Sequence, residues 1–513
     1  MLVKTFAAAV SGISATIITI EVSCTKGIQF FLVGLPDIAV RESHERIISA
    51  LQVSGYKFPR NRIVINMAPA DIRKEGSAYD LPLAIGVLAA AGDIDATLLD
   101  KYMLMGELSL DGNLQPIKGA LPIAIKAREE GFKGFILPRK NAREAAVVDK
   151  LDVLGAENIK EVIDFFSGKG GLEPTIVNTR EDFFSHQQHF DSDFSDVRGQ
   201  ENVKRALEVA AAGGHNMVMI GPPGSGKSML AKRLPSILPP LSLLEALETT
   251  KIHSVAGKVG EQTSLLSQRP FRSPHHTISN VAMVGGGSFP QPGEVSLAHN
   301  GVLFLDELPE FNRSVLEVLR QPLEDRHINI SRARFSVDYP AGFMLVASMN
   351  PCPCGFYNHP TRPCVCPPGT VQKYLNRISG PLLDRIDIQI EITPVPFEKI
   401  SEQRPSESSS IVRERVIKAR EIQKIRYENH KGIHCNAQMS SKDLHKYAVP
   451  DNEGLSLLKN AMQRLNLSAR AYDRILKLSR TIADLDEAEN IKSYHLAEAI
   501  NYRNLDRESW GSA

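Results

Sequence analysis

The sequence of 513 residues contains no run of about 18 consecutive apolar residues, so we expect no membrane-spanning helix and no membrane partner. Its first residues soon alternate between apolar and polar, which argues against a secretory signal peptide. Six cysteines in a chain of this length do not resemble the disulfide framework of a small secreted protein. These absences predict a cytoplasmic protein.

An excess of charge of one sign is also missing, because 60 Lys and Arg residues nearly balance 59 Asp and Glu residues. The net charge of +1 neither requires nor excludes nucleic acid, which only a local basic surface could bind. The length corresponds to about three domains, and the composition is ordinary for a globular protein.

Residues 221–228 read Gly-Pro-Pro-Gly-Ser-Gly-Lys-Ser between an apolar, strand-type run at 217–220 and the start of a helix. This is the P-loop pattern G-x-x-x-x-G-K-[ST] in its required context. Glycines allow backbone N–H groups to turn toward phosphates, and the helix N-terminus adds partial positive charge. We expect Lys227 to contact the β- and γ-phosphates of ATP and Ser228 to ligate Mg²⁺. The predicted nucleotide-binding residues are Gly221, Pro222, Pro223, Gly224, Ser225, Gly226, Lys227, Ser228 and Asp306.

A second apolar run, at 301–305, ends in two carboxylates, Asp306 and Glu307. Asp306 is placed to hold Mg²⁺ through water, and Glu307 is placed to orient and deprotonate an attacking water. A buried strand that is merely capped by acids is the alternative. Together with the P-loop, this run predicts ATP binding and hydrolysis.

Composition and periodicity divide the chain into four segments. We predict an α/β unit at 1–167, a polar linker at 168–195, the nucleotide-binding domain at 196–398 and a helical domain at 399–513. Within the first unit we expect strands at 16–22, 29–33, 62–66 and 135–137, and helices at 39–53, 81–91 and 120–130.

Around the two phosphate-site motifs, the sequence resembles an AAA+ ATPase of the magnesium-chelatase-like YifB/ComM family over nearly the whole chain. Residues 194–200 look like the segment that lies over the adenine base, 271–276 look like a chelatase-family signature, and 293–300 are similar to the family's approach to the Asp306 strand. The resemblance implies an α/β fold with a Lon-protease-like N-terminal domain (ribosomal S5 domain 2-like), an AAA+ P-loop domain and a C-terminal helical lid.

Asn350 follows the apolar run at 343–347 and matches the family's sensor-1 residue, which polarises the attacking water. An asparagine that starts a turn before Pro351 has the same local appearance, and this alternative stays open.

Two arginines match residues that complete such a site. Arg385 resembles an arginine finger, which reaches a neighbour's γ-phosphate and therefore implies a closed, hexameric ring. The alternative is a surface arginine paired with Asp384 or Asp387. Arg470 resembles the sensor-2 arginine that reaches the nucleotide, and the alternative is an ordinary arginine on a helix surface.

Residues 327–337 alternate apolar and polar, which predicts a hairpin with Arg332 and Arg334 near its tip. In related ring helicases a hairpin here projects basic side chains into the pore, where they contact DNA phosphates without reading sequence. The resemblance thus implies single-stranded or branched DNA as a partner, and a plain hairpin is the alternative.

Cys352, Cys354, Cys364 and Cys366 could form a tetrahedral, structural Zn²⁺ site, although the C-x-C spacing is tighter than the usual C-x₂-C. His359 is a spare candidate ligand. Four thiolates leave no open position for a catalytic metal, and the alternatives are free thiols or disulfides.

Residues 67–82 and 105–138 resemble the Lon-type domain, whose Ser–Lys dyad is a peptidase nucleophile and base. Here the aligned dyad positions are Ala78 and Ile123, so we expect no proteolysis, although Ser77 is adjacent. Arg73 and Lys74 are the expected surface residues for a partner.

The sequence and the resemblance together predict an ATP-hydrolysing ring motor acting on DNA, of the branch migration type used in recombination or natural transformation. The alternatives are a chelatase-type ATPase subunit that remodels a protein partner and an ATP-dependent peptidase.

Overall fold

A computed structural model describes residues 1–187, 190–287, 290–332, 335–395, 406–430, 432–465 and 467–503. The chain forms two compact units. The first comprises Met1–Gln187 and Ser242–Ser267, and the second comprises Gln188–Leu241 and Gln268–Ala513. Among the described residues, every helix is too short or too polar to cross a membrane.

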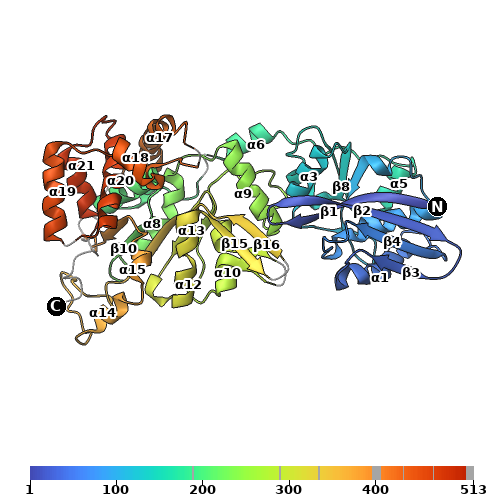
Figure 1. Ribbon diagram of the computed structural model, residues 1–513, viewed down its shortest axis with the longest axis horizontal. Coiled ribbons are helices and arrows are strands. Elements are labelled where there is room, and N and C mark those ends of the chain that lie inside the picture. Colours follow the sequence, from blue (N-terminus) through green and yellow to red (C-terminus); the bar gives the residue numbers. More distant parts are fainter. Residues whose placement is uncertain are drawn as a thin grey trace. The chain divides into compact units, whose positions relative to one another are not determined.

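The first unit is built on a seven-stranded sheet in the order β3-β4-β2-β1-β5-β8-β9 (Figure 1). β1 and β2 form an antiparallel hairpin, β4 is antiparallel to β2, and the remaining neighbours are parallel. The strands are β1 (Leu2–Ser11), β2 (Ser14–Thr25), β3 (Phe30–Val33), β4 (Arg62–Ala68), β5 (Tyr102–Leu104), β8 (Gly134–Pro138) and β9 (Asp152–Ala156), with a small separate hairpin of β6 (Glu107–Leu108) and β7 (Leu114–Gln115).

Helices cover this sheet, and α2 (Asp80–Ala91) is buried along almost its whole length. Exposed and buried residues alternate in β2 and β4, as expected for strands with one face on the core. The other helices are α1 (Ile38–Val53), α3 (Ala120–Glu129), α4 (Arg139–Ala145), α5 (Ile159–Phe166), α6 (Thr179–His186) and α9 (Leu243–Val255), with 3-10 turns η1 (Ser77–Tyr79) and η2 (Leu99–Lys101). All the strands and helices predicted for this unit are present.

Helix α9 differs from the predicted organisation. Its residues fall within the predicted nucleotide domain, 196–398, but they pack on the first unit. The backbone N–H of Gly119 donates to the carbonyl of Ser254 at 3.0 Å, and Leu247 lies against the core of the first unit. The predicted linker at 168–195 is also partly helical, because it contains α6 and the start of η3 (Phe194–Asp196).

The second unit contains a five-stranded parallel sheet in the order β11-β14-β17-β10-β18. Its inner strands are buried on both faces, which explains their continuous apolar sequences. The strands are β11 (Phe271–Arg272), β14 (Val302–Leu305), β17 (Met344–Met349), β10 (Met217–Ile220) and β18 (Ile388–Glu391), accompanied by the hairpins β12 (Gly285–Gly286) with β13 (Gln291–Pro292) and β15 (His327–Arg332) with β16 (Phe335–Pro340).

Helices of the second unit cover the sheet and form the helical C-terminal part (Figure 1). Those that precede or follow the sheet strands are α7 (Glu201–Gly213), α8 (Lys227–Arg233), α10 (Asn280–Val284), α11 (Glu294–Leu297), α12 (Arg313–Val318), α13 (Arg320–Asp325), α14 (Thr370–Leu375) and α15 (Gly380–Leu383). The C-terminal part has α17 (Ser409–Arg426), α18 (Ser441–Tyr447), α19 (Asn452–Arg464), α20 (Ala469–Leu485) and α21 (Ser493–Asn501). Further 3-10 turns are η4 (Leu234–Ile237), η5 (Leu308–Glu310) and η6 (Asn436–Gln438).

A buried polar cluster joins the C-terminal helices to the sheet of the same unit. His215 Nδ1 lies 2.9 Å from Asp387 Oδ2, and His215 Nε2 lies 2.8 Å from the hydroxyl of Thr481 on α20. Arg474, also on α20, donates to the other oxygen of Asp387 at 2.7 Å. Hydrogen bonds and opposite charges within the cluster partly offset the cost of burying these groups, and they tie α20 to the base of the sheet.

Candidate active site

The P-loop lies between the C-terminal end of β10 and the start of α8, as predicted. The N–H of Gly221 donates to the carbonyl of Met349 at 3.1 Å, which fixes the loop beside β17. Gly224 and Gly226 have φ angles of 76° and 89°, a left-handed backbone that favours glycine. The loop is therefore folded in a conformation that only this glycine pattern allows without strain.

Lys227 begins α8 and is buried beneath the loop. Its ammonium donates to the carbonyls of Gly221 at 2.7 Å and Pro222 at 2.9 Å, and to Asn350 Oδ1 at 3.2 Å. Burial lowers the pKa of this ammonium, and the nearby carboxylates of Asp306 and Glu307 oppose that shift. The structure thus brings the P-loop lysine to the asparagine that follows β17.

Asp306 follows β14, and its carboxylate is held by three donors. Ser228 Oγ donates to Oδ2 at 2.7 Å, the backbone N–H of Glu307 donates to Oδ1 at 3.1 Å, and Ser348 Oγ also donates to Oδ1. Sequence reasoning missed Ser348, since a serine inside a buried strand carries no motif. The three parallel strands therefore deliver Ser228, Asp306 and Asn350 to one edge of the sheet.

Glu307 has a φ of 54°, which is uncommon for a residue with a side chain and costs of order 1 kcal/mol. Its side chain is exposed, and Oε2 lies 3.9 Å from Nδ1 of His276. His276 belongs to the signature at 271–276, which carried no role in the sequence interpretation. Because its side chain is exposed, the Glu307 carboxylate is accessible to a water molecule.

The residues present fit Mg²⁺ and ATP. The Oγ of Ser225 is buried in the loop without a hydrogen-bond partner among the described residues, so a phosphate oxygen would satisfy it. The hydroxyl of Ser228 and the carboxylate of Asp306 supply the oxygen ligands that Mg²⁺ prefers. These two side chains would hold the metal.

A cavity of about 560 Å³ opens above the P-loop. Its walls come from the loop itself, from the segment predicted to lie over adenine and from the region of the cysteine cluster. The lining residues outside the P-loop are Asp196, Arg198, Met229, Phe356, His359, Thr361, Arg362, Pro394 and Val395. Sequence reasoning did not foresee the contribution of Phe356, Thr361 and Arg362.

Arg385 and Arg470 lie together, but their bonds do not go to the P-loop. Arg385 donates to Pro381 O at 2.6 Å and to Glu324, and Arg470 donates to Asp384 at 2.8 Å. Arg470 is 72% exposed. Arg470 therefore lies on the surface, whereas the side chain of Arg385 is only 16% exposed, and Asp384 connects the backbone next to Arg385 to α20.

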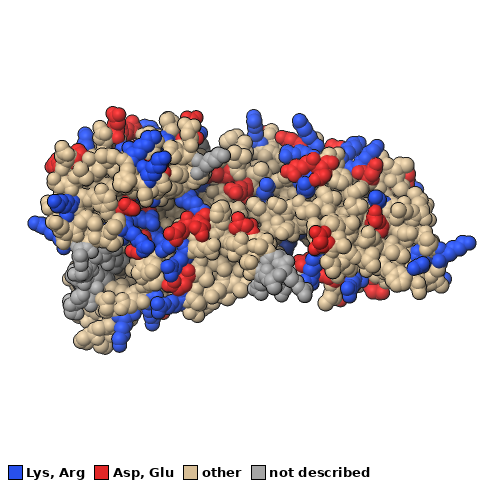
Figure 2. All heavy atoms as spheres, in the orientation of Figure 1, with Lys and Arg blue, Asp and Glu red and all other residues tan. Residues whose placement is uncertain are grey.

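Arg332 is the last residue of β15, and the predicted hairpin is present with β16. The side chain of Arg332 and the whole of Arg334 lie outside the described residues. On the face drawn in Figure 2, Lys and Arg side chains are interspersed with Asp and Glu over each unit, in line with the near-zero net charge.

The four clustered cysteines converge, with their sulfur atoms all within 4.8 Å of one another. His359 is not part of this group. Its Nδ1 accepts hydrogen bonds from the backbone N–H groups of Thr361 and Arg362, each at 3.1 Å, and its ring lines the nucleotide cavity instead.

In the first unit, Ile123 is buried in α3 and Ser77 begins η1. Lys126 is paired with Glu130 at 2.7 Å, and the described hydrogen bonds include none between Ser77 and a lysine. The expectation that Lys74 is a surface residue is wrong. Lys74 is buried and its ammonium donates to the carbonyl of Pro69, because the backbone around it is bonded to Asp37 and Leu35.

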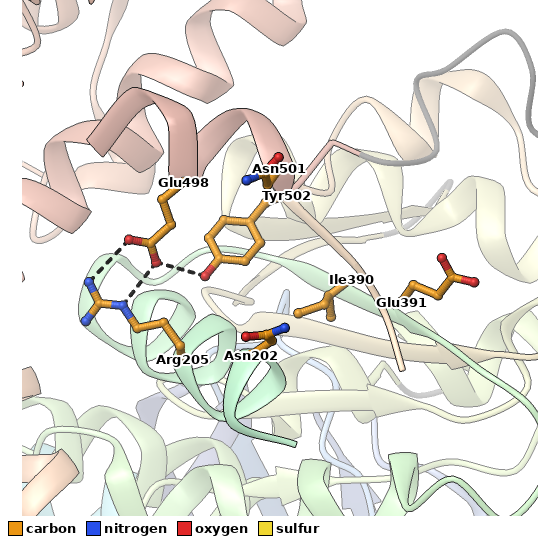
Figure 3. Close-up of a pocket in the computed structure, with 7 residues that line it drawn as sticks. All are labelled: Asn202, Arg205, Ile390, Glu391, Glu498, Asn501 and Tyr502. Carbon is orange, nitrogen blue, oxygen red and sulfur yellow. Dashed lines mark hydrogen bonds and ion pairs between the residues drawn. The ribbon is translucent and has the colours of Figure 1, made fainter. Parts of the chain in front are cut away.

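A second cavity, of about 530 Å³, lies between α7, β18 and α21 (Figure 3). Arg205 is the cation among its lining residues, and it donates to both oxygens of Glu498, at 3.0 and 3.4 Å. Tyr502 donates to the same carboxylate at 3.0 Å. Two carboxylates, Glu391 and Glu498, line the cavity beside this one cation, so its charge does not favour a phosphate.

Comparisons with known proteins agree with the site. Residues 193–400 match the family described as magnesium chelatase, subunit ChlI, and 406–503 match its C-terminal part. Residues 20–141 match a family described as subunit ChlI of Mg-chelatase. Members of this family are ATPases, which suggests ATP and Mg²⁺ as cofactors.

Relatives extend this similarity over the whole chain. YifB of Salmonella typhimurium is 46% identical over 501 residues, covering 97% of this chain and 96% of that protein. Competence protein ComM of Haemophilus influenzae is 43% identical with the same coverage. Lon protease 2 of Bacillus subtilis is 31% identical over 157 residues, which are 28% of this chain and 27% of that protein. The chain therefore belongs to the magnesium-chelatase-like family of ATPases that includes YifB and ComM.

Proposed function

We propose that this protein is an ATP-hydrolysing ring motor that acts on single-stranded or branched DNA, as a branch migration helicase in recombination or natural transformation. The observation that carries the proposal is the convergence of Lys227, Asp306 and Asn350 at one edge of the parallel sheet. The similarity to a competence protein supports the choice of DNA as the partner.

The residues of the site have separate roles in this proposal. The ammonium of Lys227 exchanges its bonds to loop carbonyls for bonds to the β- and γ-phosphates. Ser228 and Asp306 would hold Mg²⁺, which would supply positive charge to the phosphates. Glu307 takes a proton from the attacking water, and the amide of Asn350 orients that water.

Arg385 completes the site of a neighbouring subunit as an arginine finger, and Arg470 is the sensor-2 residue that reaches the nucleotide. The side chain of Arg385 is 16% exposed and is bonded to Glu324, and in the ring it would exchange this bond for one to the neighbour's γ-phosphate. An arginine finger stabilises the charge that develops during phosphoryl transfer. The ATP site of one subunit then needs a residue from a different surface of the next subunit, so the interface is head-to-tail. Such an interface can close into a ring, which we propose is hexameric.

The β15–β16 hairpin is the proposed DNA contact, through Arg332 and Arg334. The test is the steady-state rate of ATP hydrolysis without DNA and with single-stranded, duplex and four-way-junction DNA, at one salt concentration because phosphate contacts depend on salt. Stimulation by single-stranded or branched DNA is expected. A rate of ATP hydrolysis that none of these DNAs changes would favour an ATPase subunit that remodels a protein partner.

Variants of the hairpin arginines and of the active-site residues test the two parts of this proposal separately. Replacing Arg332 and Arg334 by Ala should abolish stimulation and leave the basal rate unchanged, whereas Lys57→Ala with Arg60→Ala, which removes the same charge from an exposed loop of the first unit, should not affect stimulation. Lys227→Ala is the control that should not hydrolyse ATP. Glu307→Gln should bind ATP and fail to hydrolyse it, and a normal rate in either single variant would refute the assignment of the active site.

A further inference from the structure

The segment from Cys352 to Cys366 follows the active-site residue Asn350 and contains no helix or strand. The sulfur of Cys352 lies 3.2 Å from that of Cys354 and 3.7 Å from that of Cys364, and the sulfurs of Cys354 and Cys364 are 3.5 Å apart. A tetrahedral zinc with bonds of about 2.3 Å holds its sulfurs about 3.8 Å apart, whereas a disulfide needs about 2.05 Å. The separations match shared metal ligands and exclude disulfides in this conformation.

Backbone groups of the same segment support the sulfurs. The N–H groups of Phe356 and Val365 donate to the sulfur of Cys354, and the N–H of Tyr357 donates to that of Cys352. Hydrogen bonds of this kind stabilise thiolates and orient them toward a metal. The segment is therefore folded around the point where the four sulfurs meet.

This segment also forms part of the nucleotide cavity. Gly355 has a φ of 84°, and a Cβ there would lie 2.5 Å from Cδ of Pro223, so the segment packs directly on the P-loop. Phe356, His359 and Arg362 line the cavity. The Arg362 guanidinium lies 5.3 Å from the centre of the Phe356 ring, and the His359 ring meets Phe356 edge-on at 5.5 Å.

We propose that Cys352, Cys354, Cys364 and Cys366 bind one structural Zn²⁺, and that this metal holds the segment as a wall of the ATP cavity, so that its occupancy sets nucleotide affinity. The inference rests on the proposed function only in taking ATP as the ligand of this cavity. A segment without helix or strand loses much conformational freedom when it is ordered, and metal binding supplies the free energy that offsets this loss. Four thiolates close the coordination sphere, so the metal takes no part in the chemistry.

The first test measures zinc in the purified full-length protein by elemental analysis. One zinc per chain is expected in the unaltered protein and in Cys24→Ser, which alters a buried cysteine of the first unit. Cys364→Ser should lose the metal. Absence of bound zinc after purification and after incubation with zinc alone would overturn the metal site.

The second test measures binding of a fluorescent ATP analogue, which does not depend on hydrolysis or DNA. Cys364→Ser and protein stripped by a chelator should bind it about three- to tenfold more weakly, since the aromatic and cationic wall is lost, and zinc should restore the stripped protein. Phe356→Ala should weaken binding similarly but keep its zinc. Unchanged affinity in both Cys364→Ser and the stripped protein would overturn the coupling.

The outcomes separate this inference from the proposed function. A protein that holds zinc and needs it for nucleotide binding, yet shows no DNA-stimulated hydrolysis, would retain the inference and lose the motor. A protein without zinc whose ATP hydrolysis is stimulated by DNA would support the proposed motor and overturn the zinc inference.

Discussion

Asp306 is the residue on which hydrogen bonds from three different parts of the chain converge. Ser228 comes from α8, the N–H of Glu307 from the turn after β14, and Ser348 from β17. A carboxylate held by several donors keeps a fixed orientation. The position of a metal bound to Asp306 therefore depends on Ser348 as well as on the P-loop.

We predict that Ser348→Ala lowers the rate of ATP hydrolysis about 10- to 100-fold, the usual cost of removing a group that orients a metal ligand. The Mg²⁺ concentration needed for half-maximal hydrolysis should rise, which a change in folding alone would not cause. Magnesium titrations of the hydrolysis rate provide the measurement.

Ser236→Ala is the matched control, because it removes a buried hydroxyl of the same unit that bonds to Arg233 O and to Ser409. Its magnesium dependence should stay that of the unaltered protein. A Ser348→Ala variant with the same magnesium dependence would show that the hydroxyl does not position Asp306.

The sequence predicted Lys227, Ser228, Asp306 and Glu307 as site residues because phosphate binding needs a fixed local order of residues, and that order is visible in a single chain. It could not identify Ser348 or Phe356. Their roles come from strand register and from the packing of a distant segment, which local patterns do not encode. The same limit applies to Lys74, whose burial depends on the surrounding backbone.

At the scale of elements, apolar runs and turn residues predicted β2, β3, β4 and β8 of the first sheet and β10, β14 and β17 of the second, since these signals are local. They did not predict the short strands β5, β9, β11 and β18. Helix α9 shows what such local signals do not predict. Its first residues, Ser242 to Glu245, form a capping box that is visible in the sequence. The helix nevertheless packs on the first unit. Ser254, on α9, lies beside the carboxylate of Glu144, which accepts a hydrogen bond from the backbone N–H of Leu121. Periodicity reports which face of a helix is buried but not against which partner.

The cluster of His215, Asp387 and Arg474 links two elements of the second unit and gives stability a pH dependence. Burial lowers the pKa of His215 below its usual value of about 6.5, despite the opposing effect of Asp387. The pKa of Asp387 is also lowered, because Arg474, His215 and Lys477 outweigh its burial. At neutral pH the imidazole is therefore uncharged and the carboxylate is ionised.

We predict that the second unit loses stability as the pH falls below about 6.5, because the unfolded chain then binds a proton at residue 215 that the folded chain resists. A further loss begins below about pH 4, where the unfolded chain also protonates residue 387. Calorimetry between pH 8 and pH 5 measures the first step. The stability contributed by His215 is complete above the pKa that it has in the unfolded chain. This stability is lost as the pH falls toward the lower pKa that His215 has in the folded chain.

His215→Gln keeps a donor for Asp387 but cannot titrate, so its melting temperature should vary less over this range. His445→Gln, which alters an exposed histidine of α18, should follow the unaltered protein. Equal slopes for the unaltered protein and His215→Gln would assign the pH dependence to other groups.

At the scale of the whole molecule, the chain joins an ATPase unit to an α/β unit that lacks the aligned peptidase dyad. Buried Ile123 cannot act as a base, and Lys126 is engaged by Glu130. The near-zero net charge provides no general attraction to DNA. In the proposed motor, DNA must therefore be held by local groups, and coordinated action must come from assembly of several chains.

The assignment of Arg385 to a neighbour's site makes a prediction that no property of a single chain would produce. Lys227→Ala lacks a working P-loop but keeps Arg385, whereas Arg385→Ala keeps the P-loop and lacks the finger. Each variant alone should be inactive. In rings assembled from an equal mixture, about one interface in four joins an intact P-loop to an intact finger, so hydrolysis should reappear.

Mixed rings of Lys227→Ala and Glu307→Gln are the control, because both defects lie in the same half of the site and no interface is complete. Differently tagged subunits, purified together, establish that mixing has occurred. Restoration only in the first mixture would place Arg385 in trans. If copurified rings of Lys227→Ala and Arg385→Ala stay inactive while each variant remains folded, Arg385 serves its own chain, through its bond to Glu324 or otherwise, and the ring no longer follows from this residue.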